Sequence, residues 1–309
     1  MNILFHCNFT NHKDFYNLIK KKIKNHKIHT SDKNINYQKI DIAIVWNLPN
    51  QILKELTNLK VIFSLGAGVD HILKLKSYQN TPIIRIKDPD MRKKMFNHAL
   101  SQILNYQLKL SSYYKAQQKQ IWLDGITSLS NNKIKIGIMG TGYIGSYVGK
   151  KLQKLDYQVV GFKNSIQNSI TTFPVLRGKE ISDFIKNSDI LVSILPSTNQ
   201  TNNLINTKFL KKMKKKSLLI NIGRGSSINE EDLIKHLNSN KNFYVSLDVF
   251  KKEPLSKNHK FWKHPNVTIT PHIAAITDAE SAIDYIYDRL SKFVKLGKIK
   301  SDVNLENGY

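Results

Sequence analysis

The chain has 309 residues, more than one hydrophobic core of ordinary size needs, so we expect two domains. Its single cysteine, Cys7, excludes an intrachain disulfide, and no CxxC motif or Cys/His cluster signals a bound metal. The formal charge of +25 favours anionic partners, but the lysines are spread along the chain without interleaved aromatic residues, which disfavours nucleic acid. Since no apolar run reaches about 18 residues, we expect a cytoplasmic protein without a membrane partner.

Short apolar runs alternate with polar helical stretches over the first hundred residues. The apolar runs lie at 3–5, 41–46, 61–65 and 83–86. Helical patterns separate them at 11–25, 49–57 and 69–77. This alternation predicts βαβ units and a parallel sheet.

A long helical pattern follows at 92–118, with no Gly or Pro to interrupt it. Its apolar positions have helical spacing: Met95, Phe96, Ala99, Leu100, Ile103, Leu104 and Leu108. The pattern predicts one long helix, which either bridges two domains or belongs to the core of one. His98 lies on its apolar face, and we expect only packing or a helix-face contact from it.

The alternation of strands and helices restarts beyond residue 133. Strands are predicted at 134–139, 159–162, 190–195, 218–222, 243–249 and 267–270, with helices between most of them. This predicts a second doubly wound unit. A final amphipathic helix is predicted at 277–296, with one apolar face formed by Ala282, Ile283, Ile286, Leu290 and Phe293.

A glycine-rich segment follows the strand at 134–139 and opens the next helix: Gly140-Thr141-Gly142-Tyr143-Ile144-Gly145. In this context Gly140 makes a tight turn, Gly142 lets the backbone approach a pyrophosphate, and Gly145 permits close packing of helix on strand. The helix N-terminus also favours an anion. The segment therefore predicts a bound dinucleotide, and we assign all six residues to the cofactor site.

The end of the next strand bears on the choice between NAD and NADP. The residues there are Phe162, Lys163, Asn164 and Ser165. An NAD site places Asp or Glu at this point to bind the ribose hydroxyls. With no carboxylate to repel a 2′-phosphate, and with Lys163 able to bind one, the sequence favours NADP(H) and leaves NAD(H) possible. Lys163 could equally be a surface lysine, so the missing carboxylate is the stronger signal.

Three later segments carry side chains suited to redox chemistry. Arg224 follows the strand at 218–222, Glu253 lies 29 residues further on, and His272 another 19 beyond it. In order and spacing these segments resemble the Arg, Glu and His motifs of the D-2-hydroxyacid dehydrogenases. The loop 196–201 resembles the family's loop after the fourth strand of the cofactor domain. The resemblance implies further cofactor contacts from Leu195, Pro196, Thr201 and Asp248.

Within that family, four stretches look most like the glyoxylate/hydroxypyruvate reductase branch: 45–46, 63–70, 264–265 and 268–277. The stretches 91–94 and 223–227 depart from that branch, so the substrate is less well defined than the chemistry. The resemblance implies a Rossmann dinucleotide-binding domain at 102–272, inserted in a flavodoxin-like substrate domain at 1–101 that is completed by a C-terminal helix at 273–309. It also implies a homodimer.

Reduction of a 2-oxo acid moves hydride to the carbonyl carbon, so negative charge builds on the oxygen and a proton must reach it. His272 suits the role of general acid, with Glu253 orienting its ring, while Arg224 clamps the carboxylate and polarises the carbonyl. The resemblance adds a substrate pocket, formed by the backbone N–H groups of Ala67, Gly68 and Val69 and by the side chains of Trp46 and Arg85.

Two alternatives stay open. The chain could act on another 2-hydroxy acid, because the sequence does not place the residues that set pocket size. It could instead be a dinucleotide-sensing binding protein, since a few relatives are corepressors. Against the second reading, Arg224, Glu253 and His272 are all present, and a pure binder has no physical need for them.

Overall fold

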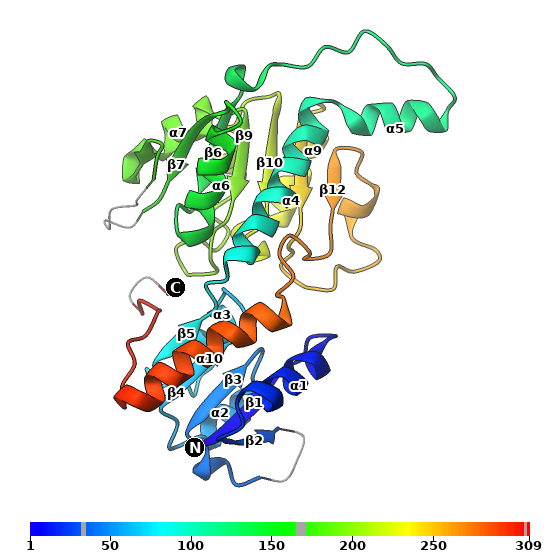
Figure 1. The fold of residues 1–309 in the computed structure, drawn as a ribbon. Helices are drawn as coiled ribbons and strands as arrows, with labels where there is room; N and C mark the ends of the chain where they lie inside the picture. Colours follow the sequence, from blue (N-terminus) through cyan, green and yellow to red (C-terminus); the bar gives the residue numbers. More distant parts are fainter. Residues whose placement is uncertain (32–34, 165–170, 306–307) are drawn as a thin grey trace. The chain divides into compact units, whose positions relative to one another are not determined.

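The computed structural model describes residues 1–31, 35–164, 171–305 and 308–309 (Figure 1). It divides into two compact units: Met1–Met91 with Thr277–Tyr309 (unit 1), and Arg92–Ile276 (unit 2). The chain thus crosses between units near 91 and 276, whereas the sequence placed the boundaries at 101/102 and 272/273. Within the described ranges no helix is long and apolar enough to cross a membrane.

Unit 1 is built on a five-stranded sheet in the order β2-β1-β3-β4-β5. All its pairings are parallel, and this is the flavodoxin-like order. The strands are β1 (Asn2–His6), β2 (Lys27–Thr30), β3 (Ile42–Val45), β4 (Val61–Ser64) and β5 (Ile83–Arg85). The sequence predicted four of them and missed β2, a four-residue edge strand with no fully buried position.

Helices cover both faces of this sheet. They are α1 (His12–Lys22), α2 (Asn50–Glu55), α3 (Asp70–Leu73) and α10 (Ala279–Leu296). The apolar face predicted for the last helix is confirmed, because all five of its residues are buried in α10. Side by side on one face, α1 and α10 are joined by an ion pair between Lys22 and Asp284. The C-terminal segment is therefore an integral part of unit 1.

Unit 2 contains a seven-stranded sheet in the order β12-β11-β10-β9-β6-β7-β8. Its strands are β6 (Lys135–Met139), β7 (Gln158–Phe162), β8 (Val175–Leu176), β9 (Ile190–Ser193), β10 (Ser217–Asn221), β11 (Phe243–Leu247) and β12 (Val267–Ile269). Every pairing is parallel, and the strand order reverses between β6 and β9, as in a Rossmann sheet. The predicted α/β fold class is confirmed.

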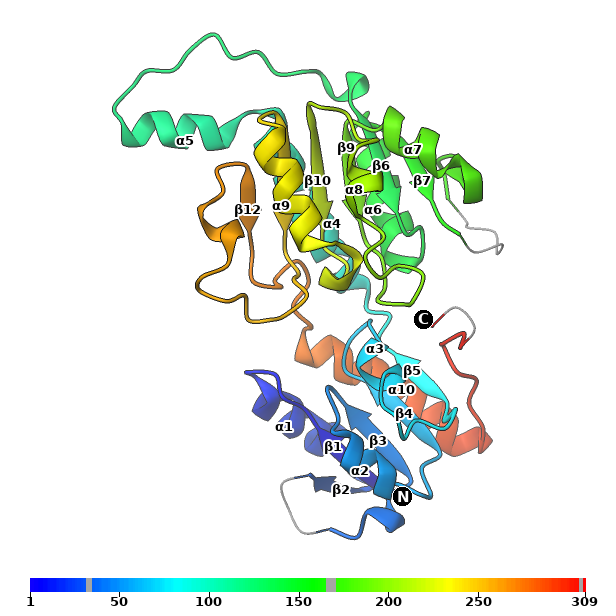
Figure 2. The same ribbon diagram turned by 180° about the vertical axis from the view of Figure 1, so that it is seen from behind.

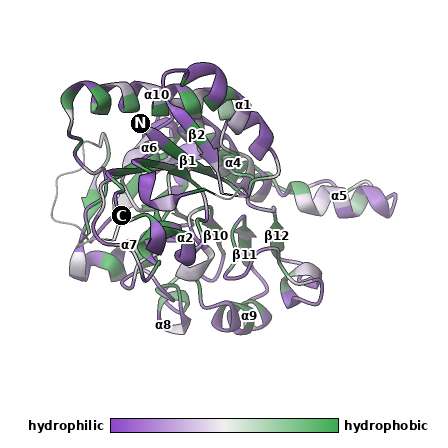
Figure 3. Ribbon diagram, turned by 90° about the horizontal axis from the view of Figure 1, so that it is seen from below, coloured by the Kyte–Doolittle hydropathy of each residue, from purple (hydrophilic) through white to green (hydrophobic). Residues whose placement is uncertain are grey.

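Both faces of the unit 2 sheet are buried, because successive residues of each strand point to opposite sides. Ile136, Ile138 and Val192 pack into a core with helices α4 (Pro89–Gln107) and α6 (Tyr143–Gln153). Leu191 and Leu219 pack into a second core, under α7 (Ile181–Asn187), α8 (Thr207–Leu210) and α9 (Glu230–Ser239) (Figure 2). In Figure 3 most strands are hydrophobic, whereas hydrophilic and hydrophobic residues alternate along the helices.

The helix predicted at 92–118 is two helices. It begins earlier, at Pro89 in α4, and breaks before α5 (Leu110–Gln118). The break is at Lys109, whose φ of 56° is left-handed and incompatible with a continuing helix. No Gly or Pro in the sequence marks this break. Beyond it, α5 and the segment that follows extend away from the rest of unit 2 (Figure 1).

Candidate active site

The glycine-rich turn joins β6 to α6. Gly140 has a φ of +91°, and a Cβ there would lie 2.9 Å from the carbonyl oxygen of Ile194. At Gly145 a Cβ would lie 1.9 Å from the Gly140 oxygen. Both positions thus require glycine. A Cβ at Gly142, the N-cap of α6, would meet no atom within 4 Å. This open face over a helix N-terminus fits the pyrophosphate of a dinucleotide.

The other residues of the turn are held from both sides. Thr141 is buried, and its methyl group lies over Gly161 of β7. Tyr143 is exposed, and the Arg92 guanidinium lies 5.1 Å from its ring centroid. Ile144 packs against the core beneath α6. These contacts fix the turn before any ligand binds.

The loop after β9 lies next to this turn, where the strand order reverses. Leu195 is half-buried, and its backbone closely approaches Gly223. The Thr201 hydroxyl donates to the carbonyl of Pro196 at 2.6 Å and accepts from the Thr198 N–H at 2.9 Å. The Thr201 side chain thus closes the loop on itself. The crevice beside such a reversal is where open parallel sheets bind ligands.

Lys163 follows β7, and the structure brings a second cation beside it. Phe162 pairs with Leu176 of β8, so Arg177 occupies the register position next to Lys163. Burial lowers the pKa of Lys163, and the positive charge of Arg177 lowers it further. The sequence reading missed Arg177, because the two-residue strand β8 gives almost no pattern. Asn164 is exposed, and Ser165 lies outside the described residues.

Arg224, Glu253 and His272 come together beyond the carboxyl ends of β10, β11 and β12. His272 Nδ1 lies 2.7 Å from a Glu253 carboxylate oxygen, and the other oxygen accepts the Phe250 N–H at 2.9 Å. Partial burial opposes ionisation of Glu253. The hydrogen bonds from His272 and Phe250, together with the charges of His272 and Arg224, nevertheless bring its pKa below the usual value. Glu253 is therefore a carboxylate, and the Nδ1 of His272 must donate to it.

Close packing of two loops brings Arg224 toward Glu253. A Cβ on Gly225 would lie 2.0 Å from the Phe250 carbonyl carbon, so only glycine lets the loops approach this closely. Arg224 donates from Nη1 to the Gly223 carbonyl at 3.0 Å and is half-buried. Its guanidinium is thereby held at the edge of the sheet, on the side of Glu253.

A single buried carboxylate shapes the turn that carries His272. Asp248, only 1% exposed, accepts from the Thr270 hydroxyl at 2.6 Å and from the N–H groups of Ile273 and Ala274 at 2.9 Å. The Asp248 carbonyl accepts the His272 N–H at 2.7 Å. His272 has a φ of 55°, a conformation that costs a non-glycine residue about 1–3 kcal/mol. These bonds offset that cost. Asp248, which the sequence assigns to the cofactor site, therefore also shapes this turn.

In unit 1, the glycine turn after β4 is held by side chains that the sequence reading did not single out. Ser64 Oγ contacts the carbonyls of Gly66 and Gly68 at 3.1 Å and His71 Nε2 at 3.2 Å. The rings of Trp46 and His71 are 4.2 Å apart. A Cβ on Gly66 would lie 2.4 Å from the Trp46 ring, which therefore lies against this turn.

The remaining predicted substrate residues lie around the same turn or on the next strand. Ala67 and Gly68 are partly exposed, whereas Val69 is buried. Arg85 ends β5, beside β4 in the sheet. Burial lowers the pKa of Arg85, and the negative charge of Asp302 opposes that shift. Arginine is effectively always protonated in proteins, so Arg85 remains a cation.

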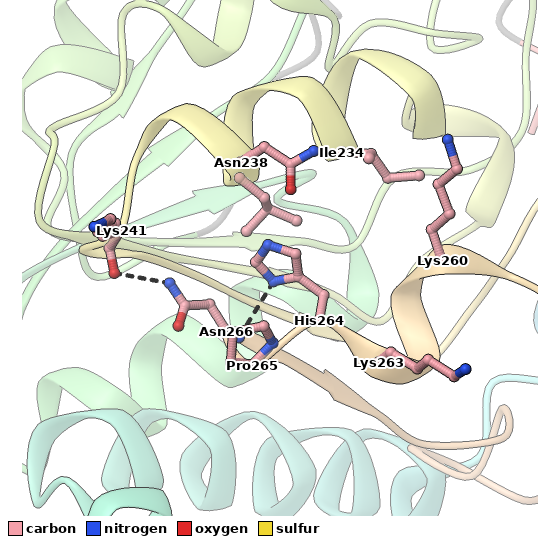
Figure 4. A pocket seen from close by; sticks show the side chains of 9 residues that line it. Ile234, Asn238, Lys241, Lys260, Lys263, His264, Pro265 and Asn266 are labelled. Carbon is pink, nitrogen blue, oxygen red and sulfur yellow. Dashed lines mark hydrogen bonds between the residues drawn. The ribbon is translucent and has the colours of Figure 1, made fainter.

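A pocket lies elsewhere in unit 2, between α9 and the residues that precede β12 (Figure 4). Its lining includes Lys241, Lys260, Lys263 and His264. None of the predicted catalytic residues lines it. The resemblance at 264–265 therefore concerns a part of unit 2 other than the His272 site.

The glycine turn, the strand order and the open helix N-terminus together define a Rossmann-type dinucleotide-binding unit. A His–Glu pair lies beyond the carboxyl ends of its strands. Residues 100–274 match the family model described as D-isomer specific 2-hydroxyacid dehydrogenase, NAD binding domain. The chain belongs to the D-isomer-specific 2-hydroxyacid dehydrogenase family, and the expectation from the motifs is confirmed.

Individual relatives point to one branch. A glyoxylate/hydroxypyruvate reductase A from Citrobacter koseri is 33% identical over 275 residues, 87% of this chain and 88% of that protein. The Yersinia enterocolitica protein of the same name is 32% identical and covers 93% of both chains. Among solved structures, the NADPH-dependent glyoxylate/hydroxypyruvate reductase from Sinorhizobium meliloti with NADP and sulfate has a TM-score of 0.91 at 27% identity, covering 100% of this chain and 99% of that one.

The lowered pKa of Glu253 gives its carboxylate a pH-dependent part in stability. Such a group stabilises the fold above its unfolded pKa, and the contribution is lost as the pH falls through the folded pKa. We expect wild type to be more stable than Glu253→Gln at pH 7, with a difference that shrinks below about pH 4.3, the ordinary value for Glu. Denaturant unfolding across pH measures this. Glu55→Gln, at an exposed site, is the control. An equal difference at pH 7 and pH 3 would contradict the prediction.

Proposed function

We propose that this chain is an NADPH-dependent reductase of small 2-oxo acids, converting glyoxylate to glycolate and hydroxypyruvate to D-glycerate. The contact that carries the proposal is the 2.7 Å bond between His272 and Glu253, with Arg224 close enough to lower the Glu253 pKa. The names of the relatives support the same substrates. We further propose a cytoplasmic location, where the Cys7 thiol stays reduced.

The His–Glu pair is arranged to deliver a proton. Since the Nδ1 hydrogen of His272 is donated to Glu253, Nε2 is the ring nitrogen that can hold a proton at the substrate oxygen. The Glu253 carboxylate on Nδ1 also holds the ring in one orientation. The cofactor, when bound, supplies the hydride. As negative charge develops on the carbonyl oxygen, His272 protonates it.

Arg224 supplies the matching positive charge. Its planar guanidinium can bind the substrate carboxylate with two parallel hydrogen bonds and polarise the adjacent carbonyl. In unit 1 we propose that the N–H groups of Ala67, Gly68 and Val69 bind the carboxylate, and that Trp46 and Arg85 line the pocket. The Ser64 and His71 contacts hold that turn in one conformation, which reduces the entropy lost on binding.

Removing the acid tests the mechanism. We expect His272→Ala to lower kcat with glyoxylate and NADPH about 10²–10⁴-fold, because the proton is no longer delivered. Arg224→Ala should lower kcat/KM, with its main effect on 2-oxo acid binding. His12→Ala, at an exposed site on α1, should be unchanged. Assays with glyoxylate, hydroxypyruvate and pyruvate define the substrate. A folded His272→Ala protein with wild-type turnover would overturn the proposal, and a preference for pyruvate would redirect it to another 2-oxo acid.

For the cofactor, we propose that Lys163 and Arg177 bind the 2′-phosphate of NADPH. They lie side by side at the ends of β7 and β8, and a phosphate between them would relieve the repulsion that contributes to the lowered Lys163 pKa. No carboxylate is present among the residues at the end of β7, Phe162, Lys163 and Asn164, to hold the ribose of NAD.

The KM values of single variants for NADPH and for NADH test the roles of Lys163 and Arg177. Lys163→Ala and Arg177→Ala should each raise the KM for NADPH about 10- to 100-fold, the loss expected for a charge-assisted hydrogen bond. The KM for NADH should change little, because NADH lacks the phosphate. Lys186→Ala on α7 removes an exposed charge and serves as control. Wild type that uses NADH as well as NADPH would show that the assignment is wrong.

We also propose a homodimer in which a second copy covers the α5 arm, defined as residues 108–129. Its exposed apolar side chains follow one another along one segment: Leu108, Tyr114, Ile121, Trp122, Leu123, Ile126 and Leu129. Trp122 is 91% exposed. A run of this kind, extending from its own unit, suits burial against an identical chain, since C₂ dimers are the commonest homo-oligomers.

Light scattering on a gel-filtered sample tests the dimer. Wild type should have twice the 35.6 kDa mass of one chain. Trp122→Asp should shift the protein toward the monomer, because the charge would be buried in the interface. Tyr287→Asp places a charge at a site 46% exposed on α10 and should leave the mass unchanged. A monomeric wild type would rule the dimer out.

A further inference from the structure

His98, on α4, is hydrogen-bonded to the network that shapes the His272 turn. Its Nε2 lies 3.1 Å from the Thr270 hydroxyl oxygen and 3.6 Å from an Asp248 carboxylate oxygen. Its side chain is only 10% exposed, and Nδ1 is buried with no hydrogen-bond partner among the residues that the structure describes. The Nε2 contact to Thr270 is therefore the ring's polar anchor.

The donor and the acceptor of each hydrogen bond in this series, from His98 through Thr270 to Asp248, can be assigned. The Asp248 carboxylate only accepts hydrogen bonds, so the single Thr270 hydroxyl hydrogen is donated to it at 2.6 Å. The Thr270 oxygen must then accept from His98, which carries its hydrogen on Nε2. Burial lowers the pKa of His98, while the charge of Asp248 opposes that shift. A neutral ring with the hydrogen on Nε2 satisfies every group in the series.

The series ends at the backbone of the turn. Asp248 accepts the N–H groups of Ile273 and Ala274, and its own carbonyl accepts the N–H of His272. These bonds surround the one residue of the turn with a left-handed conformation. Any rotation of the Asp248 carboxylate would move the turn, and with it the imidazole that meets Glu253.

We propose that His98 is a positioning residue that, through Thr270 and Asp248, holds the His272 turn in the conformation that presents its ring to Glu253. This rests on the proposed role of His272 as the acid. The helix that carries His98 is packed by Met95, Ala99 and Ile103 into the core under β6 and β9. The donor therefore comes from a rigid element, which a positioning role requires.

Paired substitutions in the full chain test the proposal. Thr270→Val keeps the shape of the side chain but removes the hydroxyl, whereas Thr270→Ser keeps the hydroxyl. His98→Leu removes the donor, whereas His98→Gln can place an amide N–H near Thr270. With NADPH and glyoxylate we expect kcat to fall about tenfold for Thr270→Val and His98→Leu, while the KM for NADPH is unchanged. Thr270→Ser and His98→Gln should keep most of the wild-type kcat.

A second readout does not depend on turnover. Hydrogen exchange of the peptide spanning 271–276 should quicken at least tenfold in Thr270→Val and His98→Leu, and exchange of the 135–139 strand should not. Unchanged kcat and unchanged exchange in Thr270→Val would overturn the proposal even if His98→Leu failed to fold. Equal loss of kcat in the Val and Ser variants would overturn it too. If the wild type reduced no 2-oxo acid but exchange of 271–276 still quickened in Thr270→Val and His98→Leu, the positioning would be supported and the reductase rejected.

Discussion

The conformation of the candidate site depends on one buried carboxylate. Asp248 lies at the end of β11, almost completely removed from water, where an unpaired charge would be strongly unfavourable. Three donors compensate it, and all three belong to the turn that carries His272. The requirement to satisfy this charge thus selects one backbone conformation. The strained φ of His272 follows from that selection.

The sheet explains why distant residues meet. Arg224, Asp248 and His272 follow β10, β11 and β12, which are neighbours in the sheet and run parallel. Their carboxyl ends therefore share one edge, and short loops suffice to bring the side chains together. The glycine turn after β6 opens on the same edge, beside the point where the strand order reverses. The proposed sites of nucleotide binding and proton transfer thus share one edge of one sheet.

Much of this architecture could be predicted from sequence, because fully buried parallel strands such as β9 and β10 are uninterrupted apolar runs. Elements without such a signal were missed. The two-residue strand β8 and the partly exposed β2 have no clear pattern, and Arg177 was missed along with β8. The break at Lys109 was missed because a left-handed lysine looks like any other lysine in a helical pattern.

For the site, motifs indicated which side chains matter but not how they are held. The resemblance of the motifs implied that His272 and Glu253 act together, yet it contains no information on the distance between them. The links from His98 to Thr270 and from Ser64 to His71 join residues through space. His98 and Thr270 are 172 positions apart in the sequence, and no local pattern relates them. Such contacts are visible only once the chain is folded.

The discontinuity of unit 1 has a consequence for biosynthesis. Its sheet is complete by Arg85, but the helix α10, which covers one face together with α1, is translated only after the 185 residues of unit 2 have been translated. Until then the apolar surface beside α1 is left without its partner helix, in a chain that grows by about 5–20 residues per second. Unit 2, being continuous, has no such delay. The unit that begins the chain is therefore completed only after the whole of unit 2 has been synthesised.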